Sequence, residues 1–229
     1  LGAHKFVEWT HNGGHGGRHS SMLSAPLGQF TANVRAHVDD QGVVGLVDAF
    51  EHSVAAGIAV ATREPRLIRE RTSLGETALH LLVLGESEEA VRSILQLGAD
   101  VSALCDFGET PLSLAASSGK VNFVKVLLAA GSPLGIEGQR EPTLHNAVRS
   151  GSIETVGLLV DAGADVNEQS DFAEAPIHLA VEDDYVAIAE LLIARGADPL
   201  LRSSLDGTAL DVALRAGSAA CVALLTSKH

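Results

Sequence analysis

Ten histidines and two cysteines are the first candidates in this sequence for acid–base, nucleophilic or metal chemistry. His80, His145 and His178 are separated by 65 and 33 residues, which are about two intervals and one interval of 33 residues. An imidazole can transfer protons or bind a metal. However, nothing in the sequence orients Cys105 towards a histidine, and the chain has no phosphate-binding loop, zinc-ligand spacing or nucleophile elbow. We therefore predict no catalytic residue, no cofactor and no metal site, and we expect that the chain is not an enzyme.

A second group of histidines lies in residues 1–39. His11, His15 and His19 are four residues apart in a glycine-rich stretch. Evenly spaced histidines can bind zinc or nickel, but here no cysteine or nearby acid supports a defined site. We expect a Gly/His-rich N-terminal arm or leader over 1–39. Metal binding, or packing of its aromatic residues onto the rest of the chain, stays open as an alternative.

The composition favours a core of small side chains. The chain has 229 residues, 46% hydrophobic and only 3% aromatic. Even, small residues suit many thin layers stacked in register. No apolar run approaches the roughly 20 residues that span a bilayer, so we expect no membrane association. Cys105 and Cys221 are 116 positions apart, which argues against a disulfide framework and favours a reducing compartment, the cytoplasm or nucleus.

The charge of the chain is uneven. Residues 1–73 hold seven acids and seven Lys or Arg, whereas residues 74–229 hold 22 acids and nine Lys or Arg, which gives the net charge of −13. Nucleic acid would be repelled by such a body, so we expect no nucleic-acid partner. A basic protein partner fits this charge, although a net charge also keeps proteins soluble without any partner.

A repeat of about 33 residues organises the chain from residue 74 onwards. Five segments share one pattern: GETALHLL from Gly75, GETPLSLAA from Gly108, EPTLHNAV from Glu141, EAPIHLAV from Glu174 and GTALDVAL from Gly207. A glycine follows 19 residues after the central apolar residue in four of them, at Gly98, Gly131, Gly163 and Gly196. Internal repeats with such a period indicate stacked supersecondary units.

Each repeat predicts a pair of helices. In the best example, Thr110 can cap a helix whose first position is Pro111, where the missing N–H does no harm. Leu112 and Ala115 then fall on one helical face. A second helix follows and ends at Gly131, because glycine adopts the left-handed conformation at low cost. One helix pair cannot bury its own apolar face, so we expect a stacked array.

These segments resemble the ankyrin repeat, whose unit carries a T-P-L-H-x-A signature. The resemblance implies an all-α ankyrin-repeat solenoid of helix-turn-helix units with hairpin-like finger loops. It also implies that His80, His145 and His178 are structural and bond between neighbouring fingers. We expect an ankyrin-repeat domain over 40–229, made of a degenerate unit 40–72, full units 73–105, 106–138, 139–170 and 171–203, and a truncated end unit 204–229 with a polar end.

Two units depart from the pattern. Arg140 replaces the finger glycine in the third full unit, and Pro142 takes the threonine position, so we expect a differently shaped finger. In the fourth, Ala173 stands at the glycine position, and Asp183 and Asp184 lie near the place of Gly119, Gly151 and Gly217 in other units. Two explanations of these departures stay open: neutral sequence drift, and substitutions that adjust contacts with a partner.

The resemblance places a concave binding groove along the fingers and inner helices. Glutamates fill one variable slot in four successive units and would form a column of carboxylates about 25–30 Å long. Phe107 and Phe172 share another slot at the finger tips, and aromatic residues are enriched among interface hot spots. The column is also explained by ordinary solvated residues near helix starts. The predicted partner-binding residues are Glu76, Asp106, Phe107, Glu109, Glu141, Arg149, Asp171, Phe172, Glu174, Glu182, Asp183 and Arg215.

We therefore expect a non-catalytic protein–protein interaction scaffold, which binds an extended basic segment through its acidic concave face. Two alternatives stay open. The chain could be a regulatory or targeting domain of a larger enzyme or receptor, which its start at Leu1 would fit. It could also be an inhibitor or immunity-type protein that masks a basic surface. The sequence does not predict an oligomeric state.

Overall fold

The computed structural model describes residues 41–204 and 207–227, which form twelve α-helices and one 3-10 helix with no named strand among them. This confirms the predicted all-α solenoid. One row of helices comprises α2 (Gln41–His52), α4 (Ala78–Leu84), α6 (Pro111–Ser117), α8 (Thr143–Arg149), α10 (Pro176–Glu182) and α12 (Ala209–Ala216). The other comprises α3 (Val54–Arg63), α5 (Glu88–Gln96), α7 (Val121–Ala129), α9 (Ile153–Asp161), α11 (Val186–Ala194) and α13 (Ala219–Ser227), and η2 (Pro65–Ile68) follows α3.

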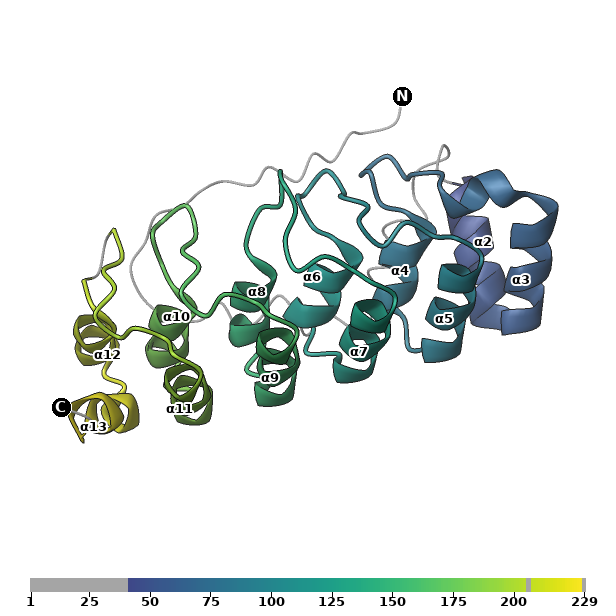
Figure 1. The fold of residues 1–229 in the computed structure, drawn as a ribbon. Helices are drawn as coiled ribbons and strands as arrows, with labels where there is room; N and C mark the ends of the chain where they lie inside the picture. The colour runs from purple at the N-terminus through teal and green to yellow at the C-terminus, as the bar shows by residue number, and fades with distance from the viewer. Residues whose placement is uncertain (1–40, 205–206, 228–229) are drawn as a thin grey trace, which may run out of the picture.

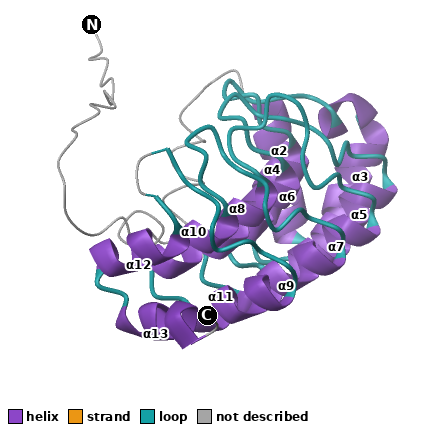
Figure 2. Ribbon diagram, turned by 60° about the vertical axis from the view of Figure 1, so that its left-hand side comes forward, coloured by secondary structure: helices purple, strands orange, loops and turns teal. Residues whose placement is uncertain are grey.

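The helix pairs stack side by side into an elongated, gently curved array (Figure 1). Within each row, every helix packs against the next, as α4 does on α6 and α5 on α7. The loops between successive pairs all project on the same side of the array as fingers (Figure 2). Neighbouring units therefore contact each other through both their helices and their fingers.

Local sequence explains where the first helix of a unit begins. The Thr110 side chain accepts a hydrogen bond from the backbone N–H of Ser113 at 3.1 Å, and the Ser113 hydroxyl accepts one from the Thr110 N–H at 2.8 Å. Pro111 is the first residue of α6, as predicted. This reciprocal pair satisfies two of the backbone donors that a helix start leaves without partners.

One apolar column runs through the array. The central apolar residue of each full unit is fully or almost fully buried: 0% of Leu79, Leu112 and Ile177 and 1% of Leu144 are exposed. The outer helices bury a matching column, Val91, Val124, Val156 and Ala189, each at 0%. Because these residues lie between one helix pair and the next, each unit is stable only beside its neighbours.

Residues 41–68 supply a helix pair ahead of the clear repeats. Leu46 and Phe50 of α2 are buried against the array, and the Ser53 hydroxyl caps α3 by accepting from the Ala56 N–H. Pro65 begins η2 here, where the later units have a glycine after their second helix. The expected degenerate unit 40–72 coincides with this pair, while the exact unit boundaries stay a prediction. Residues 1–39, with their histidines, lie outside the described residues.

The fingers are joined by backbone hydrogen bonds that recur 32 residues apart. The N–H of Asp106 donates to Leu74 O at 3.0 Å, that of Arg140 to Gly108 O at 2.9 Å, and that of Ser204 to Phe172 O at 3.0 Å. Residue 108 has to be a glycine, because a Cβ there would lie 2.9 Å from the Arg140 backbone nitrogen.

The third full unit has the expected different finger. Gly138, rather than residue 140, has the positive φ, at 85°. No backbone bond joins Gln139 to Asp171 in the part of the chain that the structure describes, although the other fingers would place one there.

Two residues other than glycine adopt left-handed backbone conformations. Ala173 has φ of 55° at the finger-glycine position, and Asp184 has φ of 53°, close to the 61° of Gly119 and 71° of Gly151. The Asp184 carboxylate also accepts from the Cys221 N–H at 3.1 Å, which gives this residue a role that glycine lacks. Alanine has no such compensation, and the left-handed conformation costs it about 1 kcal/mol or more.

Ala173→Gly is therefore expected to raise the free energy of unfolding, by about 0.5–1 kcal/mol, because relief of the strained φ exceeds the added chain entropy of glycine. Urea titration followed by circular dichroism measures this change. The matched control is Ala129→Gly at an exposed position of α7, which should destabilise the chain by a similar amount. A loss of stability in both variants would contradict the prediction.

Candidate protein-interaction surface

The three recurring histidines hold neighbouring units together. Each is 0–1% exposed, and its Nε2 lies within hydrogen-bond distance of a backbone carbonyl in the finger that follows its helix pair. The partners are Glu109 O for His80 at 3.1 Å, Glu174 O for His145 at 2.7 Å and Leu201 O for His178 at 3.0 Å. This confirms the expected structural role of the three histidines. Their imidazoles are not accessible to a substrate or metal ion from solvent.

The surroundings of His80 keep its ring neutral. Its Nδ1 accepts from the Thr77 N–H at 3.1 Å, so the proton belongs on Nε2, which donates to the Glu109 carbonyl. Burial lowers the pKa of His80 from 6.5 to about 4, with Arg71 lowering it further and the carbonyl bond opposing this. A second ring proton would also face the Thr77 donor.

His145 has the same position but lacks one bond. Pro142, which takes the threonine position of this unit, has no N–H, and Nδ1 of His145 is buried with no partner in the described residues. In the next unit, the N–H of Ala175 fills this need by donating to Nδ1 of His178 at 3.0 Å. Burial lowers the pKa of His145 as well. The departure at Pro142 therefore leaves an unmet acceptor in the array.

An exposed apolar row lies along the finger tips. Phe107 and Phe172 are 53% and 63% exposed, as expected for a contact surface. Leu74, 33 residues before Phe107, occupies the same position and is 36% exposed. The sequence reasoning missed Leu74, although the repeat interval could have found it. We call Leu74, Phe107 and Phe172 the fingertip row; Gln139 interrupts it at the third finger.

The four glutamates of the predicted column lie in different surroundings. Glu76 is only 4% exposed, and the Thr72 hydroxyl lies 3.4 Å from its carboxylate, so the expectation of a solvent-exposed carboxylate is wrong at this position. Glu109 is partly buried and accepts from the Ser113 hydroxyl. Burial raises the pKa of Glu109, while the Ser113 bond lowers it.

The other two glutamates share one cation. Arg149, at the end of α8, lies 3.0 Å from a Glu141 oxygen and 3.8 Å from a Glu174 oxygen. Burial raises the pKa of Glu174, and Arg149 opposes this. Arg149 therefore bridges two units and neutralises part of the column, as a predicted counter-charge would. Glu109, which is partly exposed, has the neutral Ser113 hydroxyl as a hydrogen-bond partner.

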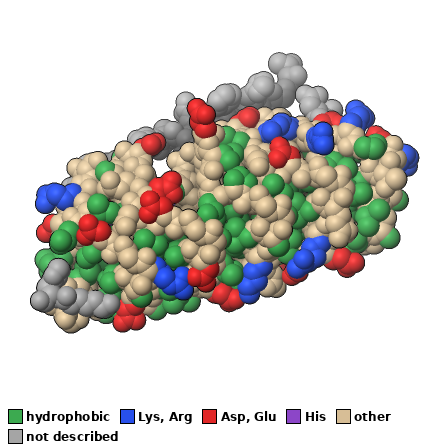
Figure 3. All heavy atoms as spheres, in the orientation of Figure 1, with side chains coloured by type: hydrophobic (Ala, Val, Ile, Leu, Met, Phe, Trp, Pro, Cys, Tyr) green, Lys and Arg blue, Asp and Glu red, His purple; other side chains and the backbone are tan. Residues whose placement is uncertain are grey.

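The remaining predicted contact residues are exposed. Asp106 and Asp171 precede the two phenylalanines of the fingertip row, and Glu182 and Asp183 lie at the end of α10. Arg215 is exposed on α12. On the face drawn in Figure 3, acidic and basic side chains are interspersed rather than gathered into one continuous acidic patch. The fingertip row with its two aspartates is thus the more distinct feature.

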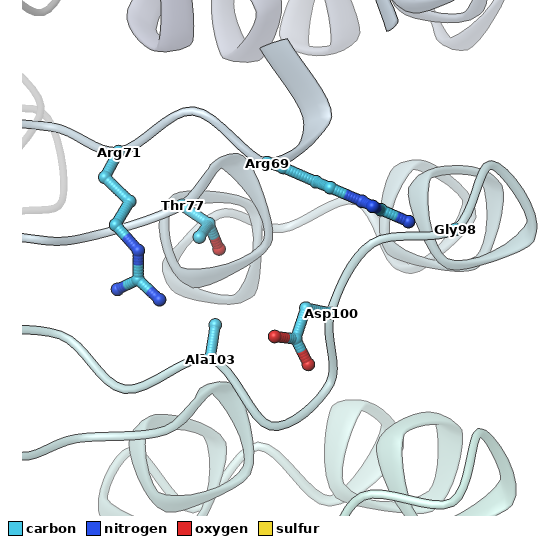
Figure 4. Close-up of a pocket in the computed structure, with 6 residues that line it drawn as sticks. All are labelled: Arg69, Arg71, Thr77, Gly98, Asp100 and Ala103. Carbon is cyan, nitrogen blue, oxygen red and sulfur yellow. The ribbon is translucent and has the colours of Figure 1, made fainter. Parts of the chain in front are cut away.

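A recess of about 360 Å³ lies between the first finger and the loop after α5. Figure 4 shows Arg69, Arg71 and Asp100 around it, so its walls carry both signs of charge. Nη1 of Arg71 donates to the carbonyls of Gly75 at 2.8 Å and Leu104 at 2.6 Å, which commits this side chain to joining fingers. We find no arrangement of nucleophile and base in this recess.

Within the described ranges, no group of three or more His, Cys, Asp or Glu side chains is placed to hold a metal ion. No helix among those residues is long and apolar enough to cross a membrane. Both cysteines are buried as free thiols.

The profile of the family described as ankyrin repeats (3 copies) matches residues 54–138 and 144–229. The chain belongs to the ankyrin-repeat family. Ankyrin repeats generally mediate protein–protein interaction, and such domains are typically non-catalytic binding modules.

Several characterised proteins resemble the chain in part. The nuclear factor NF-kappa-B p105 subunit of Gallus gallus is 33% identical over 147 residues, which is 62% of this chain and 15% of that protein. Protein phosphatase 1 regulatory subunit 27 of Homo sapiens is 43% identical over 74 residues, 32% of this chain and 45% of that protein. A putative ankyrin repeat protein of fowlpox virus, FPV223, is 30% identical over 127 residues, 54% of this chain and 86% of that protein. The chain thus spans a small part of the p105 subunits that it matches.

The pKa of His80 predicts a stability that falls in mild acid. The unfolded chain binds a proton near pH 6.5 and the folded chain near pH 4, so the contribution of His80 is complete above pH 6.5 and is lost as the pH falls to about 4. A full shift corresponds to about 3 kcal/mol. Denaturant titrations at several pH values should show this loss. His80→Ser, which copies Ser113 of the next unit, should flatten the slope between pH 6.5 and 4, whereas the exposed His52→Gln should not. Equal slopes for His80→Ser and the wild type would refute the assignment.

Pro142→Ala is expected to stabilise the chain by about 0.5–1 kcal/mol. The new N–H can donate to Nδ1 of His145 as that of Ala175 does to His178, and this gain exceeds the entropy cost of losing proline. The thermal midpoint measured by calorimetry reports the change. Pro65→Ala, at the exposed start of η2, is the control and should be neutral or slightly destabilising. A lower midpoint for Pro142→Ala would show that the buried acceptor is not what limits stability here.

Proposed function

We propose that the chain is a non-catalytic scaffold that binds an extended protein segment carrying basic and apolar residues. The fingertip row supports this most directly. Of the four finger positions at residues 74, 107, 139 and 172, three hold large apolar side chains, and those of Phe107 and Phe172 are more than half exposed. Exposed aromatic residues at regular intervals on a rigid array fit a contact surface, because they bury large areas at low entropic cost.

The charges beside the row support a basic partner. Asp106 and Asp171 precede the two phenylalanines, and both are exposed. Glu109 follows Phe107 by two residues, and its carboxylate accepts a hydrogen bond from the neutral Ser113 hydroxyl. A lysine or arginine of the partner could pair with these carboxylates while apolar residues cover the rings. Glu141 and Glu174 contribute less in this proposal, since Arg149 already lies between them.

The proposed acidic surface therefore contains fewer carboxylates than the column of four predicted from the sequence. Glu76 stays outside the proposed contact surface because it is buried. Glu182, Asp183 and Arg215 lie on or after inner helices, and in this proposal they extend the surface beyond the fingers.

A regulatory role within a larger protein is the second candidate. The likeness to the p105 subunit and to a phosphatase regulatory subunit favours it, because both of those proteins are named as subunits. The same surface would serve this role. A blocking function against a basic surface is a third use of the same contacts.

Selection of a phage-displayed library of random 16-residue peptides on the purified chain tests the proposal. We expect enriched peptides to combine Lys or Arg with apolar residues. Phe107→Ala and Phe172→Ala should each weaken a selected synthetic peptide about tenfold or more. Glu109→Gln should weaken it a few-fold at low salt and less at high salt. Isothermal titration calorimetry measures each affinity.

Ile153→Ala is the matched control, because Ile153 is an exposed apolar residue, at 46%, on the outer helix α9. It should leave the affinity unchanged. Circular dichroism establishes that each variant is folded. Peptides that bind the two phenylalanine variants as tightly as the wild type would overturn the fingertip proposal.

A further inference from the structure

The recess between the first finger and the loop after α5 is positively charged in an acidic protein. Two arginines, Arg69 and Arg71, line it against one acid, Asp100, so its lining carries one net positive charge. Both arginines come from the segment before the first finger, and Asp100 comes from the loop after α5 (Figure 4). Residues 74–229 carry the whole net charge of −13. The recess therefore attracts anions that most of the protein repels.

Arg71 has donors that its structural role leaves unused. Its Nη1 joins two fingers by donating to the carbonyls four and 33 residues later. Three units further along the chain, Gln169 makes the same pair of bonds with its amide, whose Nε2 donates to the carbonyls four and 33 residues later at 2.6 and 3.2 Å. A neutral amide is therefore enough for this role. The Nε and Nη2 groups of Arg71 donate to no residue in the described ranges.

Arg69 stands at the position that Asn167 occupies three units later. The Asn167 side chain bridges to the next loop, since its Nδ2 donates to Gly196 O at 3.1 Å and its Oδ1 accepts from the Asp198 N–H at 2.8 Å. Arg69 extends in the same way towards Gly98, the counterpart of Gly196 (Figure 4). In the part of the chain that the structure describes, however, no ion pair or side-chain hydrogen bond holds Arg69.

This exchange leaves one backbone donor without an acceptor. Asp100 is the counterpart of Asp198, whose N–H donates to the side-chain oxygen of Asn167. A guanidinium has five donors and no acceptor, so Arg69 cannot supply such an oxygen. The N–H of Asp100 has no acceptor among the described residues, while its carboxylate accepts from the Ser102 N–H at 2.8 Å. The recess thus has several donors and needs an acceptor oxygen from outside the chain.

A phosphomonoester group matches these donors. It presents three acceptor oxygens and carries close to two negative charges at neutral pH. Guanidinium groups bind phosphate oxygens through two parallel hydrogen bonds, and backbone N–H groups bind them as well. A carboxylate offers only two oxygens and one charge. With a volume of about 360 Å³, the recess also has room for part of the molecule that carries the phosphate.

From these observations we propose that the recess is a phosphate-binding site, in which Arg69, Arg71 and the N–H of Asp100 bind the phosphomonoester group of a phosphorylated protein segment. The Asp100 carboxylate opposes the anion, and the two arginines outweigh it. The site goes beyond the proposed function, because none of its lining residues belongs to the fingertip row. Only the choice of a protein segment as the carrier of the phosphate rests on that function, since ankyrin repeats generally mediate protein–protein interaction.

Titration of the ¹⁵N-labelled full chain with inorganic phosphate near pH 7.5 tests the site, with the ionic strength held constant by sodium chloride so that screening does not change. We expect a saturating NMR shift of the Asp100 N–H signal, with a dissociation constant of about 1–10 mM. Acetate should bind several-fold more weakly, because it carries a single charge. A phosphate shift that does not saturate, or acetate that binds as tightly, would contradict the proposal.

Two substitutions copy residues of the later unit and so keep the local structure. Arg71→Gln should retain the finger bonds, as Gln169 does, and raise the dissociation constant for phosphate about tenfold. Arg69→Asn should abolish binding, because the new side-chain oxygen can accept from the Asp100 N–H as that of Asn167 does from its partner. Circular dichroism establishes that both variants are folded.

Arg66→Gln is the matched control for charge. Arg66 lies on η2 in the same basic segment, its side chain is 73% exposed, and it does not line the recess. Its removal should change the affinity for phosphate less than twofold. If Arg66→Gln weakens binding as much as Arg71→Gln, diffuse attraction to the segment accounts for the effect and the site is refuted.

A synthetic phosphoserine peptide, Gly-Gly-pSer-Gly-Gly, and its unmodified serine counterpart identify the carrier of the phosphate. The phosphopeptide should shift the Asp100 signal with an affinity at least equal to that of inorganic phosphate, and the serine peptide should not shift it. A phosphopeptide that binds more weakly than inorganic phosphate would rule out a protein segment as the carrier. Phe107→Ala should leave the affinity for phosphate unchanged, so a failure of the fingertip contacts is distinguishable from a failure of this site.

Discussion

The burial of one helix pair against the next is the interaction on which the rest of this structure depends. Leu112 and Val124 are 0% exposed because they lie between two units, and no unit encloses a core of its own. Stability in such an array is approximately a sum of terms between nearest neighbours. A residue in this array is therefore buried by contact with the neighbouring unit. Exposure here is decided by the neighbour rather than by the residue type.

The fingers take their positions from this packing through a second set of contacts. Each buried histidine reaches from an inner helix to a carbonyl of the next finger, and backbone bonds link several fingertips directly. The exposed rings of Phe107 and Phe172 therefore stand on a support that is fixed at its base. A contact surface built in this way loses little entropy on binding. The third finger, with Pro142 and Arg140, has fewer of these links.

Much of the fold could be predicted from the sequence, because the residues that mark helix starts and ends recur in several units. Thr110, Pro111 and the apolar residues that follow fixed the helix start, and the 19-residue interval to Gly131 fixed its partner. The candidate site was predicted less completely. The burial of Glu76 depends on the three-dimensional packing around it. Aligning the repeats could not predict this burial, because Glu76 and Glu109 occupy the same repeat position. Arg149 was expected as a counter-charge, but its bridge between Glu141 and Glu174 depends on how far α8 reaches. Leu74 was missed because aromatic residues, rather than the shared position, guided the search.

The spacing of the fingertip row sets the distance between the side chains with which a bound segment can contact it. Phe107 and Phe172 are two units apart, and helices in contact stand about 8–10 Å from each other, so the rings are separated by roughly 20 Å. An extended chain advances about 3.3 Å per residue, which makes that distance about six residues of a bound strand. Six is an even number, so side chains at both ends of such a stretch point to the same side of the strand. A straight segment could therefore present both of its anchors to the fingers at once, and a shift by one residue would turn one anchor away.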